Sequence, residues 1–86
     1  MAKYRITIKK SAAKELEHIP RKSLQRIVKR IRSLAEDPRP QGSQKLSRQE
    51  YFRVRQGDYR IVYSIDDRDS SIDIVKIGHR REVYRS

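Results

Sequence analysis

The sequence contains no cysteine and no tryptophan, and it has only three glycines and three prolines among 86 residues. Without cysteine, neither a disulfide framework nor a thiolate metal site can form. No stretch approaches the roughly 20 apolar residues that span a bilayer, and residues 1–10 lack the apolar run of a signal peptide. We therefore expect a cytoplasmic protein with no membrane partner. A chain of this length suffices for one domain and is too short for two, so residues 1–86 are expected to form a single domain.

Acidic residues are also scarce: eleven Asp and Glu stand against 22 Lys and Arg, which leaves a net charge of +11. Such a field opposes folding through self-repulsion and attracts polyanions. Residues 1–50 carry fourteen basic and five acidic side chains, and residues 51–86 carry eight and six, so the excess lies in the N-terminal half. Nucleic acid, an acidic protein or an anionic membrane surface would each match this charge. Arginine outnumbers lysine fourteen to eight, which favours phosphate because the guanidinium fork binds it bidentately.

Apolar periodicity predicts a strand, two helices and then further strands. Residues 4–8 alternate apolar and polar side chains, as a half-buried strand does. A short helix is expected around residues 12–16, and Pro20 is suited to the first turn of a second helix. That second helix has apolar residues at three- and four-residue spacing, and Asp37 and Pro38 should end it. Its apolar residues are Leu24, Ile27, Val28, Ile31, Leu34 and Ala35.

The C-terminal half is rich in strand-forming residues. Residues 51–55 and 60–65 are separated by the hairpin signal of residues 56–59, and residues 72–77 form a last strand that Gly78 should end. The predicted order is β-α-α-β-β-β. We therefore expect an α+β fold in which two N-terminal helices pack on one face of an antiparallel four-stranded sheet.

Three arginines of the hairpin are expected on one face of this sheet. The register that buries the apolar side chains of both strands places Arg53, Arg55 and Arg60 together on the other side. Those apolar side chains are Phe52, Val54, Ile61 and Tyr63. Arg55 then lies opposite or nearly opposite Arg60, and like charges at cross-strand positions destabilise a hairpin. Each arginine alone could be an ordinary solvated side chain, but the three together predict a bound anion, with phosphate the best match.

The last strand delivers a second polar segment to one end of the sheet. An unperturbed histidine titrates near neutrality, so His79 is the natural proton carrier of this segment. Arg80 and Arg81 follow it. Tyr84 could stack on an unstacked RNA base, or it could belong to a frayed terminus.

No metal or cofactor site is evident from the sequence. Asp66, Asp67 and Asp69 are close together but lie in a predicted turn, where Asx-type hydrogen bonding is the usual reason for such residues. The chain has no glycine-rich phosphate loop, no metal-binding pair of histidines and no nucleophile elbow. We expect chemistry without a metal or a cofactor.

Three segments together resemble the RelE/ParE toxin superfamily, and the resemblance extends over essentially the whole chain. They are residues 51–55 (YFRVR), 57–63 (GDYRIVY) and 77–84 (IGHRREVY). The family has a compact sheet with two N-terminal helices, in agreement with the predicted order. The resemblance implies a RelE-like toxin that enters the ribosomal A site and cleaves messenger RNA there. In that reaction the 2′-hydroxyl of one nucleotide attacks the adjacent phosphate without a metal.

The resemblance also implies roles for single residues. It places Arg60 and Arg80 at the two phosphate-stabilising arginines of the family, with Arg81 as the alternative to Arg80. It places Tyr84 at the C-terminal tyrosine that orients or stacks on the substrate.

One departure from the family concerns proton transfer. Arg53 and Arg55 stand where the best-known members carry two lysines, and arginine effectively cannot release its proton. Both are therefore expected to clamp the charge that develops on the phosphate. We assign the proton transfer to His79, with Glu82, Tyr84 or the ribosome as the other candidates.

The resemblance implies a protein partner and leaves rival functions open. The partner is a cognate RelB-like antitoxin with an acidic toxin-binding segment, in a hetero-oligomeric complex, and the net charge agrees with it. The rivals are a catalytically inactive relative, a ParE-like toxin that inhibits DNA gyrase, and a non-catalytic RNA-binding module. The lysine-to-arginine departures leave the first open, as the second choice after an active nuclease. The hairpin arginines and the basic tail argue against the second, and the third predicts salt-sensitive RNA binding without cleavage.

Overall fold

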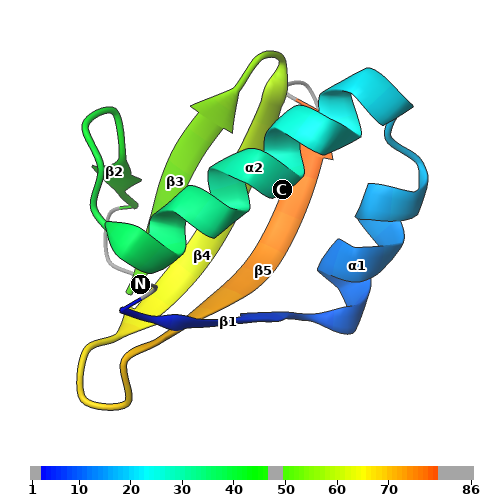
Figure 1. Cartoon of the computed structure of the whole chain (residues 1–86). Coiled ribbons are helices and arrows are strands. Elements are labelled where there is room, and N and C mark those ends of the chain that lie inside the picture. The colour runs from blue at the N-terminus through cyan, green and yellow to red at the C-terminus, as the bar shows by residue number, and fades with distance from the viewer. Residues whose placement is uncertain (1–2, 47–49, 80–86) are drawn as a thin grey trace.

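The computed structural model describes residues 3–46 and 50–79, in which two helices lie on one face of a five-stranded sheet (Figure 1). The sheet order is β1-β5-β4-β3-β2. The elements in chain order are β1 (Arg5–Ile8), α1 (Lys10–Glu17), α2 (Arg21–Glu36), β2 (Gln44–Lys45), β3 (Tyr51–Gln56), β4 (Tyr59–Asp66) and β5 (Ser71–His79). None of the helices in this part of the chain is long and apolar enough to cross a membrane.

The α+β class and the two N-terminal helices are confirmed, but the predicted four-stranded antiparallel sheet is wrong in two respects. The first strand, β1, pairs with the last strand, β5, in parallel, so the sheet is mixed. A fifth strand, β2, adds an edge next to β3. Alternation within a strand does not encode the direction of its neighbour, and a strand of two residues is too short to show any period.

The helices form where the apolar spacing predicts them. Pro20 precedes the first residue of α2, and the helix ends at Glu36 with Asp37 as its C-cap. The buried residues of α2 are Ile27, Ile31, Leu34 and Ala35. Ile27, Ile31 and Leu34 pack with the buried side chains of α1 and of the central strands into one core. The amphipathic period of α2 therefore decides which of its faces lies on the sheet.

The β3–β4 hairpin has the predicted register. Gly57 begins its two-residue turn with a φ of +60°, a conformation that favours glycine at this position of a hairpin. Phe52 pairs with Tyr63 and Val54 pairs with Ile61. Val54, Ile61 and Tyr63 are fully buried. These four apolar side chains therefore face the helices, as expected.

The last strand is longer and less regular than predicted. It continues through Gly78, which pairs with Arg60, so the expectation that Gly78 ends the strand is wrong. The register shifts between Val62 and Tyr63, because Val62 pairs with Lys76 whereas Tyr63 pairs with Ile74. One extra residue of β5 is thus accommodated in a β-bulge.

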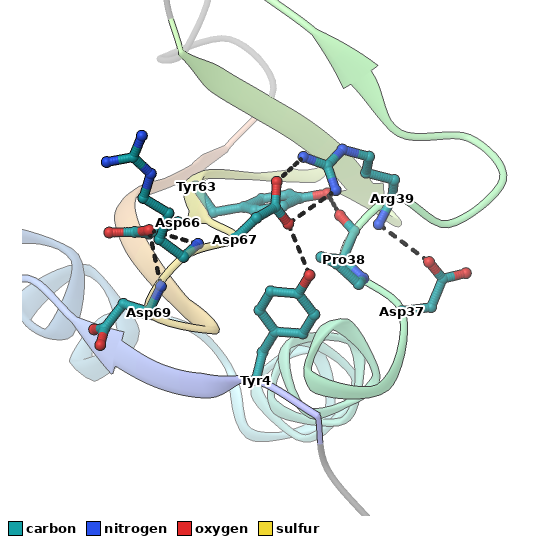
Figure 2. A network of polar contacts seen from close by, with 9 residues as sticks. Tyr4, Asp37, Pro38, Arg39, Tyr63, Asp66, Asp67 and Asp69 are labelled. Carbon is teal, nitrogen blue, oxygen red and sulfur yellow. Dashed lines mark hydrogen bonds and ion pairs between the residues drawn. The ribbon is translucent and has the colours of Figure 1, made fainter.

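A polar network ties the segment after α2 to the β4–β5 turn (Figure 2). Arg39 donates from both terminal nitrogens to Asp67, at 3.4 and 3.0 Å. The Tyr4 hydroxyl donates to the same carboxylate at 2.7 Å. Hydrogen bonds from Arg39 and then from Tyr4 hold the pKa of Asp67 below its ordinary value of 3.8. Asp67 thus joins three segments that are distant in sequence.

We expect Asp67→Asn to remove part of the acid sensitivity of folding. The depressed pKa of Asp67 means that its contribution to stability is present above about pH 4 and is lost as the pH falls through the folded-state pKa. Urea unfolding should therefore show the variant less stable than the parent at pH 7 and equal to it near pH 2. Asp58→Asn in the hairpin turn is the control, since it removes the same charge. An equal loss at both pH values for Asp67→Asn would contradict the assignment.

Candidate active site

The hairpin gathers three arginines on the face of the sheet opposite the helices. Arg55 pairs directly with Arg60, and Arg53 pairs with Val62. Side chains of residues paired across two strands point to the same side of the sheet. Each arginine directly precedes or follows a residue that faces the helices, so its own side chain points to the other side. We call this side of β3 and β4, with Arg53, Arg55 and Arg60, the arginine face. The predicted cross-strand placement of these cations is confirmed.

The three arginines differ in their exposure. Arg55 is exposed, Arg53 is half-buried, and Arg60 retains only 3% of its accessible surface. Burying a guanidinium is unfavourable unless it interacts with other polar groups or charges, and a buried charge acts more strongly on a nearby anion than a solvated one. Arg60 is therefore not an ordinary solvated arginine.

Strand β2 contributes a contact that the sequence analysis missed. Gln44 pairs with Arg53, and its Oε1 accepts a hydrogen bond from the Arg53 guanidinium. This contact limits the rotamers open to a long side chain at the edge of the arginine face. A two-residue strand has no periodic signal, and only its pairing with β3 shows that Gln44 lies beside Arg53.

Chemically, the arginine face can hold an anion and stabilise charge that develops on it. Two cations on directly opposed positions repel each other, at a cost on the order of 0.5 kcal/mol. A phosphate placed between them would offset that repulsion. None of the three can act as a general base, because an arginine side chain stays protonated.

The structure does not bring His79 to the arginine face. His79 pairs with Tyr59, and the two rings meet edge to face with centroids 5.5 Å apart. His79 also lines a small cavity with Glu15 and His18 of the helical layer. Its side chain therefore lies on the helix side of the sheet.

The bulge in β5 explains this outcome. Strict alternation from Ile72 and Ile74 would place residue 79 on the side away from the helices. The extra residue instead puts Ile77 and His79 on the same side as Ile74, where Ile77 is fully buried. An extra residue in a strand moves each side chain that follows it to the opposite face of the sheet from the one that strict alternation would predict.

Arg80, Arg81 and Tyr84 lie outside the described residues. Their roles at the site stay predictions.

The aspartates of the β4–β5 turn hold the turn itself. Asp66 accepts hydrogen bonds from the backbone N–H groups of Arg68 and Asp69, at 3.0 and 3.1 Å. Asp69 forms an ion pair with Arg5 at 2.6 Å. The expected Asx-type turn is confirmed (Figure 2). Within residues 3–46 and 50–79, no group of three or more His, Asp or Glu side chains is placed to hold a metal ion.

Comparison with known families decides the classification. The family model described as "ParE toxin of type II toxin-antitoxin system, parDE" matches residues 6–84. The chain belongs to the RelE/ParE toxin superfamily. This match covers nearly the whole chain and includes the three segments that carry the resemblance in sequence.

Two curated toxins of this superfamily are similar in sequence over almost their full length. Toxin RelE of Mycobacterium tuberculosis is 32% identical over 84 residues, which cover 95% of this chain and 87% of the relative. Toxin RelG of the same organism is 30% identical over 86 residues, which cover 95% of this chain and 97% of the relative.

Solved structures of RelE/ParE toxins have the same fold. A chain of the archaeal RelE–RelB complex from Pyrococcus horikoshii superposes with a TM-score of 0.82 at 31% identity, over 91% of this chain and 96% of that one. A chain of the RelBE2 toxin–antitoxin complex from M. tuberculosis gives 0.80 at 28% identity, over 90% and 98%. The mixed five-stranded sheet with two helices is therefore the RelE-like arrangement.

Proposed function

We propose that this toxin is a ribosome-dependent endoribonuclease that cleaves messenger RNA in the ribosomal A site and is neutralised by a RelB-like antitoxin. The reaction is a metal-free attack of a 2′-hydroxyl on the adjacent phosphate. The bond from phosphorus to the 5′-oxygen of the next nucleotide breaks, and that oxygen takes up a proton, which leaves a 2′,3′-cyclic phosphate and a 5′-hydroxyl. The observation that carries the proposal is the arginine face, with Arg60 buried and paired directly with Arg55. The relatives support it at the level of the family, since their names place them among RelE toxins and RelE–RelB complexes.

In this mechanism the arginines supply electrostatic stabilisation. Arg60 and Arg80 stabilise the extra negative charge of the pentacoordinate phosphate, with Arg81 as the alternative to Arg80. Arg53 and Arg55 clamp the non-bridging oxygens. Such fixed cations lower the barrier because they are already oriented toward the charge that develops.

Proton transfer falls to groups other than His79. The side chain of His79 lies on the helix side of the sheet beside Tyr59, so the sheet itself separates it from a phosphate on the arginine face. A general base has to reach the proton that it removes within hydrogen-bond distance or through one water. Tyr84, Glu82 and the ribosome remain the candidates, and Tyr84 also orients or stacks on the substrate.

We expect His79→Gln to change the chemistry little. Single-turnover cleavage on programmed ribosomes should stay within about threefold of the parent, and the pH–rate profile should keep its shape, because the glutamine removes a titrating group that does not reach the phosphate. A profile that loses an ionisation near neutrality in the variant would contradict this expectation and restore His79 as the proton carrier.

The antitoxin provides a second part of the proposal. Several structural neighbours are toxins in complex with RelB, and the net charge of +11 favours an acidic partner. The partner is therefore expected to cover the basic domain through an acidic segment, in a hetero-oligomeric complex.

Mapping transcript ends tests the proposed reaction. After brief expression in bacteria, primer extension should find new messenger-RNA ends within translated codons. Expression of Arg60→Ala should leave transcripts intact. Ends that persist in the Arg60→Ala strain would show that another nuclease produces them.

A ParE-like inhibitor of DNA gyrase is the second candidate, and the matched family model favours it by its description. It predicts growth arrest with intact transcripts and damaged DNA. The same expression experiment separates the two candidates.

A further inference from the structure

A shallow cavity of about 420 Å³ lies between α2 and the end of β3. Its lining residues are Arg26, Lys29, Arg30, Ser33 and Gln56, and we call it the α2 groove. None of these five is acidic or apolar. Four of the five lining residues belong to α2, which lies on one face of the sheet (Figure 1). The groove is therefore on the opposite side of the sheet from the arginine face.

The charge pattern of α2 is unfavourable for the helix itself. The helix carries six basic residues and one acidic residue, and its first turn contains Arg21 and Lys22 without any acidic side chain. A helix N-terminus favours negative charge, so this arrangement opposes the helix dipole. Arg26 and Arg30 are four residues apart on the same side of the helix, where like charges repel. A bound anion would offset this repulsion.

Arg30 is the least exposed cation of the groove. Its Nε is buried and has no hydrogen-bond partner within the described part of the chain. Unpartnered buried donors are rare in folded proteins. Beside it, the Ser33 hydroxyl donates to the Arg30 carbonyl at 2.6 Å. A phosphate in the groove would compensate this incompletely solvated guanidinium.

We propose that the α2 groove binds a phosphate of an RNA backbone. Guanidinium and ammonium groups around a hollow match a phosphate, which accepts bidentate hydrogen bonds from arginine. An amphipathic helix would need apolar side chains to dock against, as helix-in-groove recognition does, and none of the five lining residues has an apolar side chain. Because the sheet lies between the two sites, the groove binds a stretch of RNA other than the one at the arginine face.

The test compares two double variants of the full chain that remove the same charges from α2. Arg26→Ala/Lys29→Ala removes an arginine and a lysine from the groove. Lys22→Ala/Arg32→Ala removes an arginine and a lysine outside it. All four side chains are exposed, so both variants should fold, and thermal unfolding checks this. The probe is a fluorescent 2′-O-methyl RNA of about 20 nucleotides, which cannot undergo 2′-hydroxyl attack.

We expect the groove variant to bind this RNA about tenfold more weakly near 0.1 M KCl, and the control variant to lose less than about threefold. The slope of log affinity against log salt should fall by about 0.7 in the groove variant, since each phosphate contact to a single strand contributes about 0.7. Equal losses of affinity in the two variants would overturn the proposal, because they would show that RNA binds through the overall positive charge of the protein and not at the groove. Unchanged RNA affinity with weaker binding of polyglutamate would overturn it in favour of an acidic protein.

The outcome is independent of the nuclease assignment. RNA binding by the groove requires no cleavage, and cleavage is measured separately through Arg60. Cleavage without groove-dependent RNA binding would show that the groove proposal has failed. Groove-dependent RNA binding without cleavage would show that the nuclease proposal has failed.

Discussion

Arg60→Ala is expected to reduce single-turnover cleavage of ribosome-bound messenger RNA by about 100-fold or more. Removing one preoriented group that stabilises the transition state typically costs 10²–10³ in rate, or about 3–4 kcal/mol. Arg60 belongs at the strong end of this range because it is 3% exposed, and low local polarity strengthens its interaction with a phosphate. Arg55, directly opposite, cannot replace it, since its exposed guanidinium is screened by water.

Arg68→Ala is the matched control for this experiment. Arg68 lies exposed in the β4–β5 turn, so its removal lowers the net charge equally but should leave cleavage within about twofold. Arg60→Lys separates charge from geometry: it keeps a cation but loses the bidentate fork, and an intermediate rate is expected. Circular dichroism confirms folding of each variant. A folded Arg60→Ala protein that cleaves within threefold of the parent would refute the role of the arginine face.

Tyr63→Ala is expected to destabilise the fold by about 4 kcal/mol, the typical cost of truncating a buried aromatic side chain. Tyr63 is fully buried, its ring packs on Phe52 with centroids 6.0 Å apart, and its hydroxyl donates to the Pro38 carbonyl at 2.7 Å. It therefore joins the core to the segment after α2 (Figure 2). Domains of this kind are stable by about 5–15 kcal/mol, so urea denaturation should show a large fall in midpoint.

Tyr63→Phe isolates the hydroxyl. It keeps the ring but leaves the Pro38 carbonyl without its donor, and a loss of about 1–2 kcal/mol is expected. Burial raises the pKa of Tyr63 to about 12, so its contribution is present below the ordinary tyrosine pKa of about 10 and is lost as the pH rises through about 12. The phenylalanine variant should therefore lose less stability than the parent between pH 9 and 11. An equal fall in the free energy of unfolding of Tyr63→Phe and the parent between pH 9 and 11 would contradict this description. A Tyr63→Ala protein whose free energy of unfolding lies within 1 kcal/mol of the parent's would also contradict it.

The candidate site was predicted in part from sequence. The register that places Arg55 opposite Arg60 follows from burying the apolar side chains of two neighbouring strands, and this local pattern has only one satisfactory solution. The position of His79 could not be predicted in the same way. It depends on one extra residue in β5, and the segment of residues 72–77 is apolar enough that alternation does not reveal the bulge.

The sequence by itself determined the two helices, the hairpin and the shared side of its three arginines. These features depend on the spacing of apolar side chains within a few residues of one another, and each spacing matches one period of the backbone. Tertiary structure alone decided that β1 runs parallel to β5, that β2 adds an edge beside Arg53, and that His79 lies on the helix side. These features arise from backbone hydrogen bonds between strands, which any side chain can accompany and which therefore produce no local sequence pattern.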